Sequence, residues 1–346
     1  MRIEQYDPKS DEDKVRACHG LIVAAQPEDD PSLPPPSLSM LRGWLAHGFP
    51  DEPQQCWFAT ADSGAPLGCY ALELPERENR QNGFLNLLVG VGSRRRGVGT
   101  ALLAHAGRQA DANGRTLLMG GARVGGPGAA FGAAVGATAG LLEVRRTLDV
   151  GPDLHARLPG LRSEAEQRAT GYALRQWVGP TPDDLVSGVC GLYMAMADAP
   201  HDVAYEPIIW DAARLRAAEQ RSVTQGTRDY SVVAVQDGTG DVAALTQVAI
   251  DPAGAPGWAY QQLTAVTRPH RGHRLGLLIK VAMLEWLATA EPDLRHIMTG
   301  NAAVNEHMIA VNEALGHRVS DTFQSLELPV EAAVRLAVSG LPAGRA

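Results

Sequence analysis

Lysine, cysteine and long apolar segments are scarce in this 346-residue sequence, and each shortage excludes a class of protein. Only Lys9, Lys14 and Lys280 are lysines, so arginine supplies most of the positive charge. Acidic residues outnumber basic ones, 39 to 31, and the net charge of −8 argues against a general nucleic-acid-binding protein. The four cysteines lack the paired spacing of a zinc site, so we predict no metal centre and a reducing compartment.

Targeting and membrane segments are also missing from the sequence. Residues Met1–Pro8 do not resemble a signal peptide, and no apolar run approaches the length of a membrane span. We therefore expect a cytoplasmic protein, a monomer or a homodimer, with no membrane or nucleic-acid partner. Proline is concentrated in Gln26–Pro36, which predicts an exposed loop there.

A strand, a basic turn with glycine and an apolar helix occur twice, in residues 84–103 and 261–280. Three pairs of matching residues are each 177 positions apart: Val89 and Val266, Arg94 and Arg271, and Gly99 and Gly276. A repeat at half the chain length indicates a duplicated domain. We expect a first domain at residues 1–158, a linker at 159–170 and a second domain at 171–346.

Each of these turns has the chemistry of a site for a polyphosphate. The N–H groups of the first helical turn have no internal partners, and the peptide dipoles favour an anion there. Glycine lets the backbone approach the ligand, and arginine adds charge-assisted hydrogen bonds. The sequence contains neither G-x-x-x-x-G-K-[ST] nor G-x-G-x-x-G, which argues against a generic nucleotide-binding protein.

The first turn, residues 94–99, reads Arg-Arg-Arg-Gly-Val-Gly and resembles the pyrophosphate loop Arg/Gln-x-x-Gly-x-Gly/Ala of the GCN5-related N-acetyltransferases (GNATs). The second turn, residues 271–276, fits except that Arg274 takes the first glycine position. The whole chain is similar to tandem acetyltransferases of the mycothiol-synthase kind. This resemblance implies the α/β (α+β) class, with two tandem GNAT-like domains, each a mixed, mostly antiparallel sheet flanked by helices.

The resemblance also implies acetyl-CoA as the cofactor, held between two splayed parallel strands. In the first half the implied cofactor contacts are Leu87, Val89, Arg94, Arg95, Arg96, Gly97, Val98, Gly99 and Thr100. In the second half they are Val266, Arg271, Gly272, His273, Arg274, Leu275, Gly276, Asn301 and Asn305. The side chains of Leu87, Val89 and Val266 equally fit an ordinary sheet core.

Candidate catalytic residues follow from the same resemblance. In the second half, the hydroxyl of Thr264 lies on the strand beside the thioester position and needs a partner if it is buried. The family carries Asn seven residues before Tyr, and here Asn305 and Asn312 occupy these positions. Asn305 equally fits a helix cap. Asn312 cannot act as an acid, but its amide can donate a hydrogen bond to a departing thiolate. In the first half Val124 and Phe131 stand at the two positions.

A general base is harder to assign. Glu73, near the end of a strand that flanks the first cleft, is the best-placed carboxylate, whereas Gln247 occupies similar ground in the second half and cannot accept a proton. Neither Cys nor Ser lies in a nucleophile motif, so we predict direct attack. The predicted activity is transfer of an acetyl group from acetyl-CoA to a primary amine of a small molecule, with the chemistry in the second half. The alternative is a catalytically degenerate CoA-binding sensor or scaffold.

Overall fold

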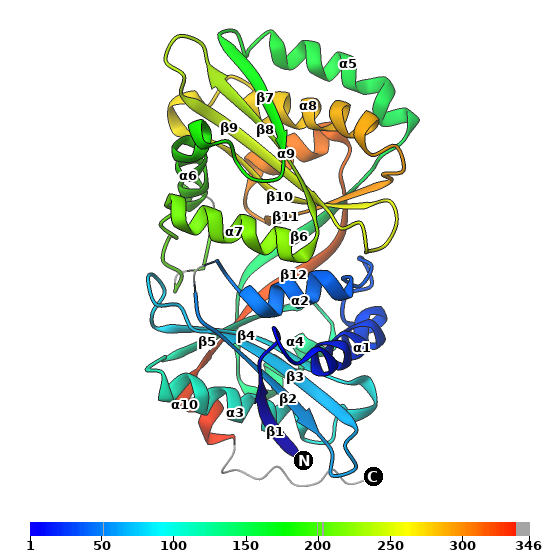
Figure 1. Ribbon diagram of the computed structural model, residues 1–346, viewed down its shortest axis with the longest axis vertical. Coiled ribbons are helices and arrows are strands. Elements are labelled where there is room, and N and C mark those ends of the chain that lie inside the picture. Colours follow the sequence, from blue (N-terminus) through cyan, green and yellow to red (C-terminus); the bar gives the residue numbers. More distant parts are fainter. Residues whose placement is uncertain (51, 199, 203, 337–346) are drawn as a thin grey trace. The chain divides into compact units, whose positions relative to one another are not determined.

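The computed structural model describes residues 1–50, 52–198, 200–202 and 204–336. It divides the chain into two compact units, which are built from interleaved segments (Figure 1). Unit 1 comprises Met1–Leu142, Asp202–Glu206 and Thr322–Ala346. Unit 2 comprises Glu143–His201 and Pro207–Asp321.

The sheet of unit 1 has the strand order β1-β2-β3-β4-β5-β12. Its strands are β1 (Arg2–Tyr6), β2 (Gln54–Thr60), β3 (Pro66–Glu73), β4 (Asn82–Val89), β5 (Leu117–Arg123) and β12 (Arg318–Pro329). Neighbouring strands are antiparallel except for β4 and β5, which are parallel. The expected mixed, mostly antiparallel sheet is therefore confirmed for this unit.

Helices cover both faces of this sheet, because alternate side chains of a strand point to opposite faces. The helices of unit 1 are α1 (Glu12–Asp29), α2 (Leu38–His47), α3 (Val98–Ala112), α4 (Pro127–Val135) and α10 (Val330–Arg335), with a 3-10 turn η1 at Val91–Ser93. On β3, Tyr70 and Leu72 pack with α3 and α10, whereas Cys69 and Ala71 pack with α1 and α2.

The loop predicted from Gln26 begins later than expected. Helix α1 continues through Pro27 and ends at Asp29, and the N–H of Asp30 still donates to the carbonyl oxygen of Gln26 at 3.0 Å. A proline removes one hydrogen bond of the helical ladder, and here the rest of the last turn persists without it.

Unit 2 repeats this arrangement with the strand order β6-β11-β10-β9-β8-β7. Its strands are β6 (Thr138–Asp149), β7 (Tyr172–Val178), β8 (Arg228–Gln236), β9 (Val242–Ile250), β10 (Trp258–Val266) and β11 (His296–Ala302). Its helices are α5 (Pro152–Glu166), α6 (Val186–Met194), α7 (Ala212–Gln225), α8 (Leu275–Ala290) and α9 (Glu306–Leu315), with 3-10 turns η2 (Asp183–Leu185), η3 (Ala195–Asp198) and η4 (Arg268–His270). Only β10 and β11 are parallel among the described pairs of this unit.

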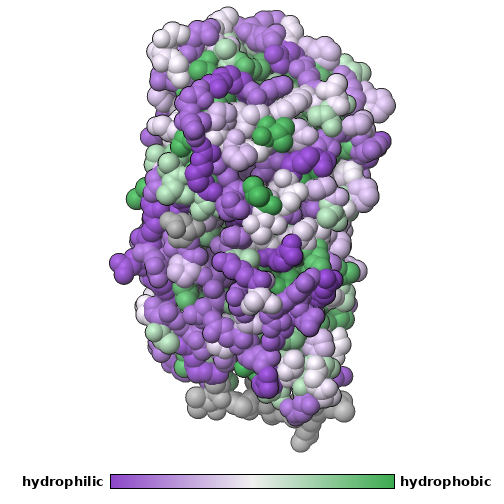
Figure 2. Space-filling model, viewed as in Figure 1, coloured by the Kyte–Doolittle hydropathy of each residue, from purple (hydrophilic) through white to green (hydrophobic). Residues whose placement is uncertain are grey.

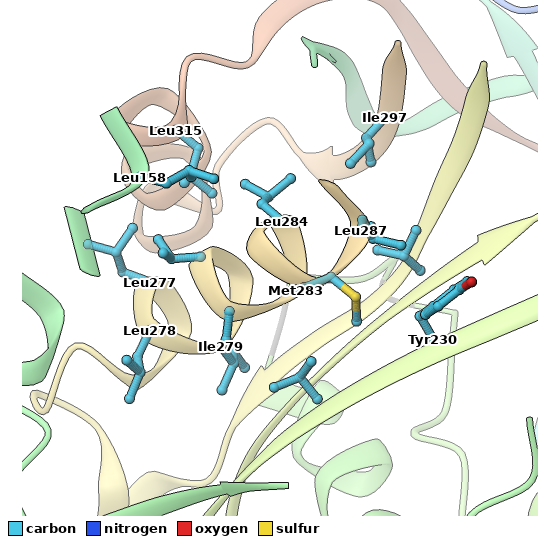
Figure 3. Packing of buried hydrophobic residues seen from close by; sticks show 14 of the residues in the cluster. Leu158, Tyr230, Leu277, Leu278, Ile279, Met283, Leu284, Leu287, Ile297 and Leu315 are labelled. Carbon is cyan, nitrogen blue, oxygen red and sulfur yellow. The ribbon is translucent and has the colours of Figure 1, made fainter. Parts of the chain in front are cut away.

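The core of unit 2 forms around α8, whose apolar side chains surround the helix axis (Figure 3). Helix α5 packs on α8 through Leu154, Leu158 and Ala165, which recur at helical spacing and are buried. Residues 159–166 are therefore part of a packed helix of unit 2, which differs from the linker expected at 159–170. Pro159 inside this helix obscures the apolar stripe in the sequence.

Each unit contains one strand that comes from the other half of the chain. Strand β6 lies in the first half of the chain, yet its residues Glu143–Asp149 pair with β11 of unit 2. Strand β12 lies in the second half, yet its residues Phe323–Pro329 pair with β5 of unit 1. The domain boundaries expected at 158 and 171 miss this exchange, because the sequence of a closing strand does not indicate which strand it pairs with.

The surface agrees with the absence of apolar runs in the sequence. Hydrophilic residues dominate the face seen in Figure 2, and the large exposed hydrophobic side chains, such as Ile209 and Val304, are scattered. Among the described residues, no helix is both long enough and apolar enough to cross a membrane.

Candidate functional site

A cavity of about 730 Å³ lies in unit 2 where two parallel strands separate. Strands β10 and β11 are paired only over Trp258–Tyr260 and His296–Met298, and they diverge beyond these residues. The walls come from β10, β11, α9, the turn η3 and the loop that leads into α8. This cavity is the splayed-strand cleft that the sequence leads us to expect in the second half.

Strand β10 carries a bulge at the cavity. Gln261 pairs with Val248 of β9 and Leu263 pairs with Gln247, so Gln262 has no partner in the register. A bulge leaves its extra residue outside the ladder and bends the strand. All three bulge residues, Gln261–Leu263, line the cavity, so the residue outside the register, Gln262, lies at its wall.

Thr264 follows the bulge and also lines the cavity. Its hydroxyl lies 2.9 Å from the hydroxyl of Thr246 on β9, and Gln261 Nε2 donates to the same Thr246 oxygen at 2.9 Å. The partner that a buried strand hydroxyl requires is therefore Thr246. The arrangement holds the Thr264 hydroxyl at the wall of the cavity.

The loop at the other end of the cavity has the same backbone as its counterpart in unit 1. Gly272 and Arg274 have φ of 87° and 55°, and the equivalent Arg95 and Gly97 have φ of 60° and 80°. Each loop thus places two residues in the left-handed conformation, and each uses glycine for only one of them. Arg274 at the first glycine position is tolerated, because an L-residue there costs only about 1–2 kcal/mol.

Asp198 on η3 closes the loop end of the cavity. It accepts hydrogen bonds from Arg268 (2.5 Å) and Arg271 (2.6 Å), and these two guanidinium groups lower the pKa of its carboxyl to about 2. Nε of Arg271 donates to the carbonyl oxygen of Val266 at 3.2 Å. The side chain of Arg271 therefore anchors the loop to its strand.

Most of the residues predicted for the second half meet at this cavity. Those that line it are Thr264, Val266, Arg271, Gly272, Arg274, Leu275, Gly276, Asn301 and Asn305, whereas His273 does not. Asn305 caps α9, because its Oδ1 accepts from the N–H of Met308 at 3.3 Å. The interpretation of Asn305 as a helix cap is therefore confirmed, and its place in the cavity lining keeps the cofactor contact a prediction.

Asn312 is placed differently from the expectation. It is fully buried, and both ends of its amide are used within the protein: Nδ2 donates to Asn301 Oδ1 at 2.7 Å, and Oδ1 accepts from Lys280 Nζ at 2.8 Å. Asn312 therefore does not face the cavity and cannot donate to a leaving thiolate. The spacing of Asn305 and Asn312 in the sequence predicted that both side chains would face the cavity. In the structure the side chain of Asn312 points toward α8 instead.

Lys280 and His317 make the interior behind Asn312 unusual. Burial lowers the pKa of Lys280 to about 7. Burial, and then the charge of Lys280, lowers the pKa of His317 to about 3, and His317 Nδ1 donates to the carbonyl oxygen of Asn312. A lysine at the centre of an apolar helix is thus linked through Asn312 to Asn301 at the cavity wall.

Unit 1 lacks several of these features. Strands β4 and β5 also diverge after a short parallel pairing, but β4 keeps an unbroken register with β3. A Cβ atom on Gly99 would lie 3.3 Å from the ring of Phe131, whereas one on Gly276 would meet nothing closer than 3.9 Å. The predicted contacts Leu87 and Val89 lie on β4, and residues 94–100 form the loop and the start of α3.

The other residues predicted for the first half lie in unit 1, outside the cavity of unit 2. Arg94 is bound by Glu28 and Asp29 at 2.8 and 2.7 Å. Glu73 ends β3 of unit 1 and is not part of the cavity of unit 2. The comparison of Phe131 with Asn312 is one residue out of register, because each helix ends at a left-handed glycine four residues after Gly132 and Asn312.

Sequence reasoning missed three residues that line the cavity, Gln262, Asp198 and His307, and the buried Lys280 behind it. Lys280 had a signal, since it is a charge within the apolar run Leu275–Leu284. His307 is exposed and also lines the cavity. The bulge at Gln262 and the ion pairs of Asp198 depend on pairing between distant segments, and no local pattern announces them.

Comparisons with known proteins agree with this architecture. No family model matches the sequence, and no curated protein does. Among solved structures, a tandem GNAT protein from the clavulanic acid biosynthesis pathway, determined without acetyl-CoA, is 31% identical, with a TM-score of 0.80 over 95% of this chain and 98% of that chain. A GCN5-related N-acetyltransferase from Sphaerobacter thermophilus is 16% identical, with a TM-score of 0.64 over 95% of each chain, and shows the fold alone. Because the first relative exceeds 30% identity over nearly its full length, the chain belongs to the tandem GCN5-related N-acetyltransferase family.

Proposed function

We propose that the cavity of unit 2 transfers an acetyl group from acetyl-CoA to a primary amine of a small molecule, by direct attack and in the cytoplasm. The observation that carries the proposal is the bulged strand β10, which puts unpaired backbone at Gln262 beside a cavity that ends at the α8 loop. A phosphate-binding helix terminus and a free backbone donor on one cleft are the two features that this chemistry requires.

The residues present fit acetyl-CoA. The N-terminal N–H groups of α8, around Leu275 and Gly276, have no helical partners and would hold the pyrophosphate. Thr264 and Asn301 offer polar side chains further along the cleft. When bound, acetyl-CoA supplies a thioester whose C–S bond is replaced by a C–N bond, with one proton leaving the amine and one going to the thiolate sulfur. The backbone N–H of Gln262 would stabilise the charge that develops on the carbonyl oxygen, a contribution of about 3 kcal/mol for one donor.

His307 is the base that we propose for the amine proton. Among the described residues that line the cavity, the titratable side chains besides arginine are Asp198, His270 and His307. Asp198 is held by two arginines, and His270 is buried against the hydroxyl of Tyr172. His307 is exposed at the wall, and histidine exchanges protons near neutral pH.

The proposal is tested by measuring CoA release from acetyl-CoA with a panel of primary amines. The variant Gly276→Val is expected to abolish turnover, because a branched side chain at the first turn of α8 keeps a ligand away from the backbone. The local fold tolerates the change, since the nearest atom to the added Cβ is 3.9 Å away. The matched control is Gly99→Val, which is expected to leave turnover in place. Turnover lost in Gly99→Val and kept in Gly276→Val would overturn the assignment to unit 2.

A sensor or scaffold that binds CoA without turnover is the second candidate. It is favoured by the burial of Asn312, which leaves the family's leaving-group position without a side-chain hydrogen-bond donor at the cavity. CoA binding by calorimetry without turnover for any amine of the panel would support this candidate over the enzyme.

A further inference from the structure

Lys280 is a buried ammonium group with an unusual environment. The residue is 2% exposed and lies on α8 among buried apolar residues. Among the described residues, the hydrogen bond recorded for its Nζ is to Asn312 Oδ1, and no carboxylate forms an ion pair with it. Buried charges are normally paired, and an unpaired one destabilises the fold. Its presence therefore requires a reason other than stability.

The hydrogen bonds of Lys280 determine the orientation of two amides. An ammonium group only donates, so Asn312 must turn its Oδ1 toward Lys280. The Nδ2 of Asn312 then donates to Asn301 Oδ1 at 2.7 Å. With its oxygen engaged, Asn301 has its NH2 group left for the cavity, which it lines. The ammonium group on α8 therefore sets the amide orientations that leave the NH2 group of Asn301 as a hydrogen-bond donor at the cleft.

We propose that Lys280 is a positioning residue that acts through Asn312 and makes Asn301 present its NH2 group to a carbonyl oxygen of the bound acyl-CoA. The inference rests on the proposed function for the identity of that ligand. Lys280 does not contact the ligand in this arrangement. A neutral amine at this position can both donate and accept, so it no longer imposes one orientation on Asn312. Loss of the proton therefore frees Asn301 to turn its oxygen to the cavity.

Among the described groups that contact the side chain of Asn312, Lys280 is the one whose pKa lies near neutrality. His317, after α9, has a pKa lowered to about 3, so its imidazole is neutral near neutral pH. The other buried basic residue of this region is Arg146 on β6. Strand β9 carries no titratable residue. Several other charged groups around α8 are bound: Arg157 to the Ala314 carbonyl oxygen, Arg162 to Glu285, Arg274 to Glu164, and Arg228 and Tyr230 to Glu291. The other titratable side chains of α5, β8, α9 and β10 are Asp153, His155, Glu166, Asp229, Glu306, His307, Glu313 and Tyr260.

The small number of lysines makes a direct test possible. Lysine labelled with 13C at Cε gives three NMR signals, from Lys9, Lys14 and Lys280, and the signal lost in Lys280→Met identifies the third. The Nδ2H2 signal of Asn301, identified with Asn301→Ala, is followed over the same pH range in the protein without ligand. We expect the Lys280 and Asn301 signals to titrate with one midpoint near neutral pH, and the Asn301 titration to disappear in Lys280→Met.

Acetyl-CoA binding supplies the second measurement. Affinity by calorimetry is expected to fall about fivefold as the pH rises through the Lys280 midpoint, the value of one lost hydrogen bond. By linkage, acetyl-CoA should raise that midpoint. Both effects should vanish in Lys280→Met, and the methionine side chain suits the surrounding apolar core. A wild-type protein that binds acetyl-CoA with the same pH profile as Lys280→Met would overturn the inference alone. Absence of any acetyl-CoA binding, with the Asn301 titration intact, would instead overturn the proposed function.

Discussion

Arg94 and Arg271, which are 177 residues apart, make the same contact in their own units. Nε of each donates to the carbonyl oxygen of the last residue of the preceding strand, at 3.3 Å to Val89 and 3.2 Å to Val266. Their outer nitrogens bind carboxylates, Glu28 and Asp29 in unit 1 and Asp198 in unit 2. The repeated arginine therefore anchors each loop, and we attribute anion binding to the backbone that it holds.

Asp198 pairs with Arg268 and Arg271 at the end of the cavity where we propose that CoA places its phosphates. In Asp198→Asn we expect CoA to bind about threefold to tenfold more tightly at low salt, because Arg268 and Arg271 become available and a negative charge leaves the cavity wall. Calorimetry at low and high salt checks this, and the gain should shrink as salt screens the charges. Weaker binding in the variant would contradict this prediction. It would mean that the ion pairs by which Asp198 holds Arg268 and Arg271 favour CoA binding more than its negative charge opposes it.

Phe131 makes a second CoA site testable. Its ring lies over Gly99, where the loop of unit 1 enters α3. We expect the native chain to bind one CoA, and Phe131→Ala to bind two, because the smaller side chain opens the approach to the loop backbone. Native mass spectrometry counts the bound molecules. Two equivalent CoA molecules on the native chain would instead support the expectation from the sequence that residues 94–100 form a working site.

Strand exchange predicts that the first half of the chain does not fold alone. Residues 1–170 contain β1 to β5 but lack β12, so the edge of β5 is left unpaired and free to associate. We expect this fragment to elute as aggregates in size-exclusion chromatography. The control joins residues 1–142 to 322–336 through a short Gly/Ser linker, which restores β12, and it should be monomeric. Both fragments lack Asp202–Glu206, so a difference between their oligomeric states is attributable to β12.

Features formed by one continuous segment could be predicted from the sequence, whereas features formed by distant segments could not. The loop at residues 271–276 and its strand and helix were predicted correctly, because the motif lies in one continuous segment. Asn312 was misplaced because helical spacing from Asn305 states which residues share a face but not which face meets α8. The partners of β6 and β12 were missed for a similar reason, since strand pairing joins segments far apart in the chain.

The buried ammonium group of Lys280 makes stability depend on pH in a defined window. Burial lowers the pKa of Lys280 from its ordinary value of 10.5 to about 7. Between pH 7 and about pH 10 the unfolded chain binds the lysine proton and the folded chain does not, so the free energy of unfolding rises with pH there. The rise approaches ~1.4 kcal/mol per pH unit and totals a few kcal/mol.

Lys280→Met removes this dependence. Below pH 7 the folded wild-type protein carries the buried charge, so we expect the variant to be more stable there by a few kcal/mol, with the difference narrowing steadily as the pH approaches 10. Urea denaturation at several pH values measures both proteins, and Lys9→Met, at an exposed position, is the matched control that should follow the wild type. Parallel pH profiles for wild type and Lys280→Met would show that Lys280 keeps an ordinary pKa in the fold. That result would also contradict the description of Lys280 as a buried amine whose hydrogen-bond partner is Asn312. An ammonium group that stays charged to high pH requires a further partner, such as a carboxylate or a water molecule.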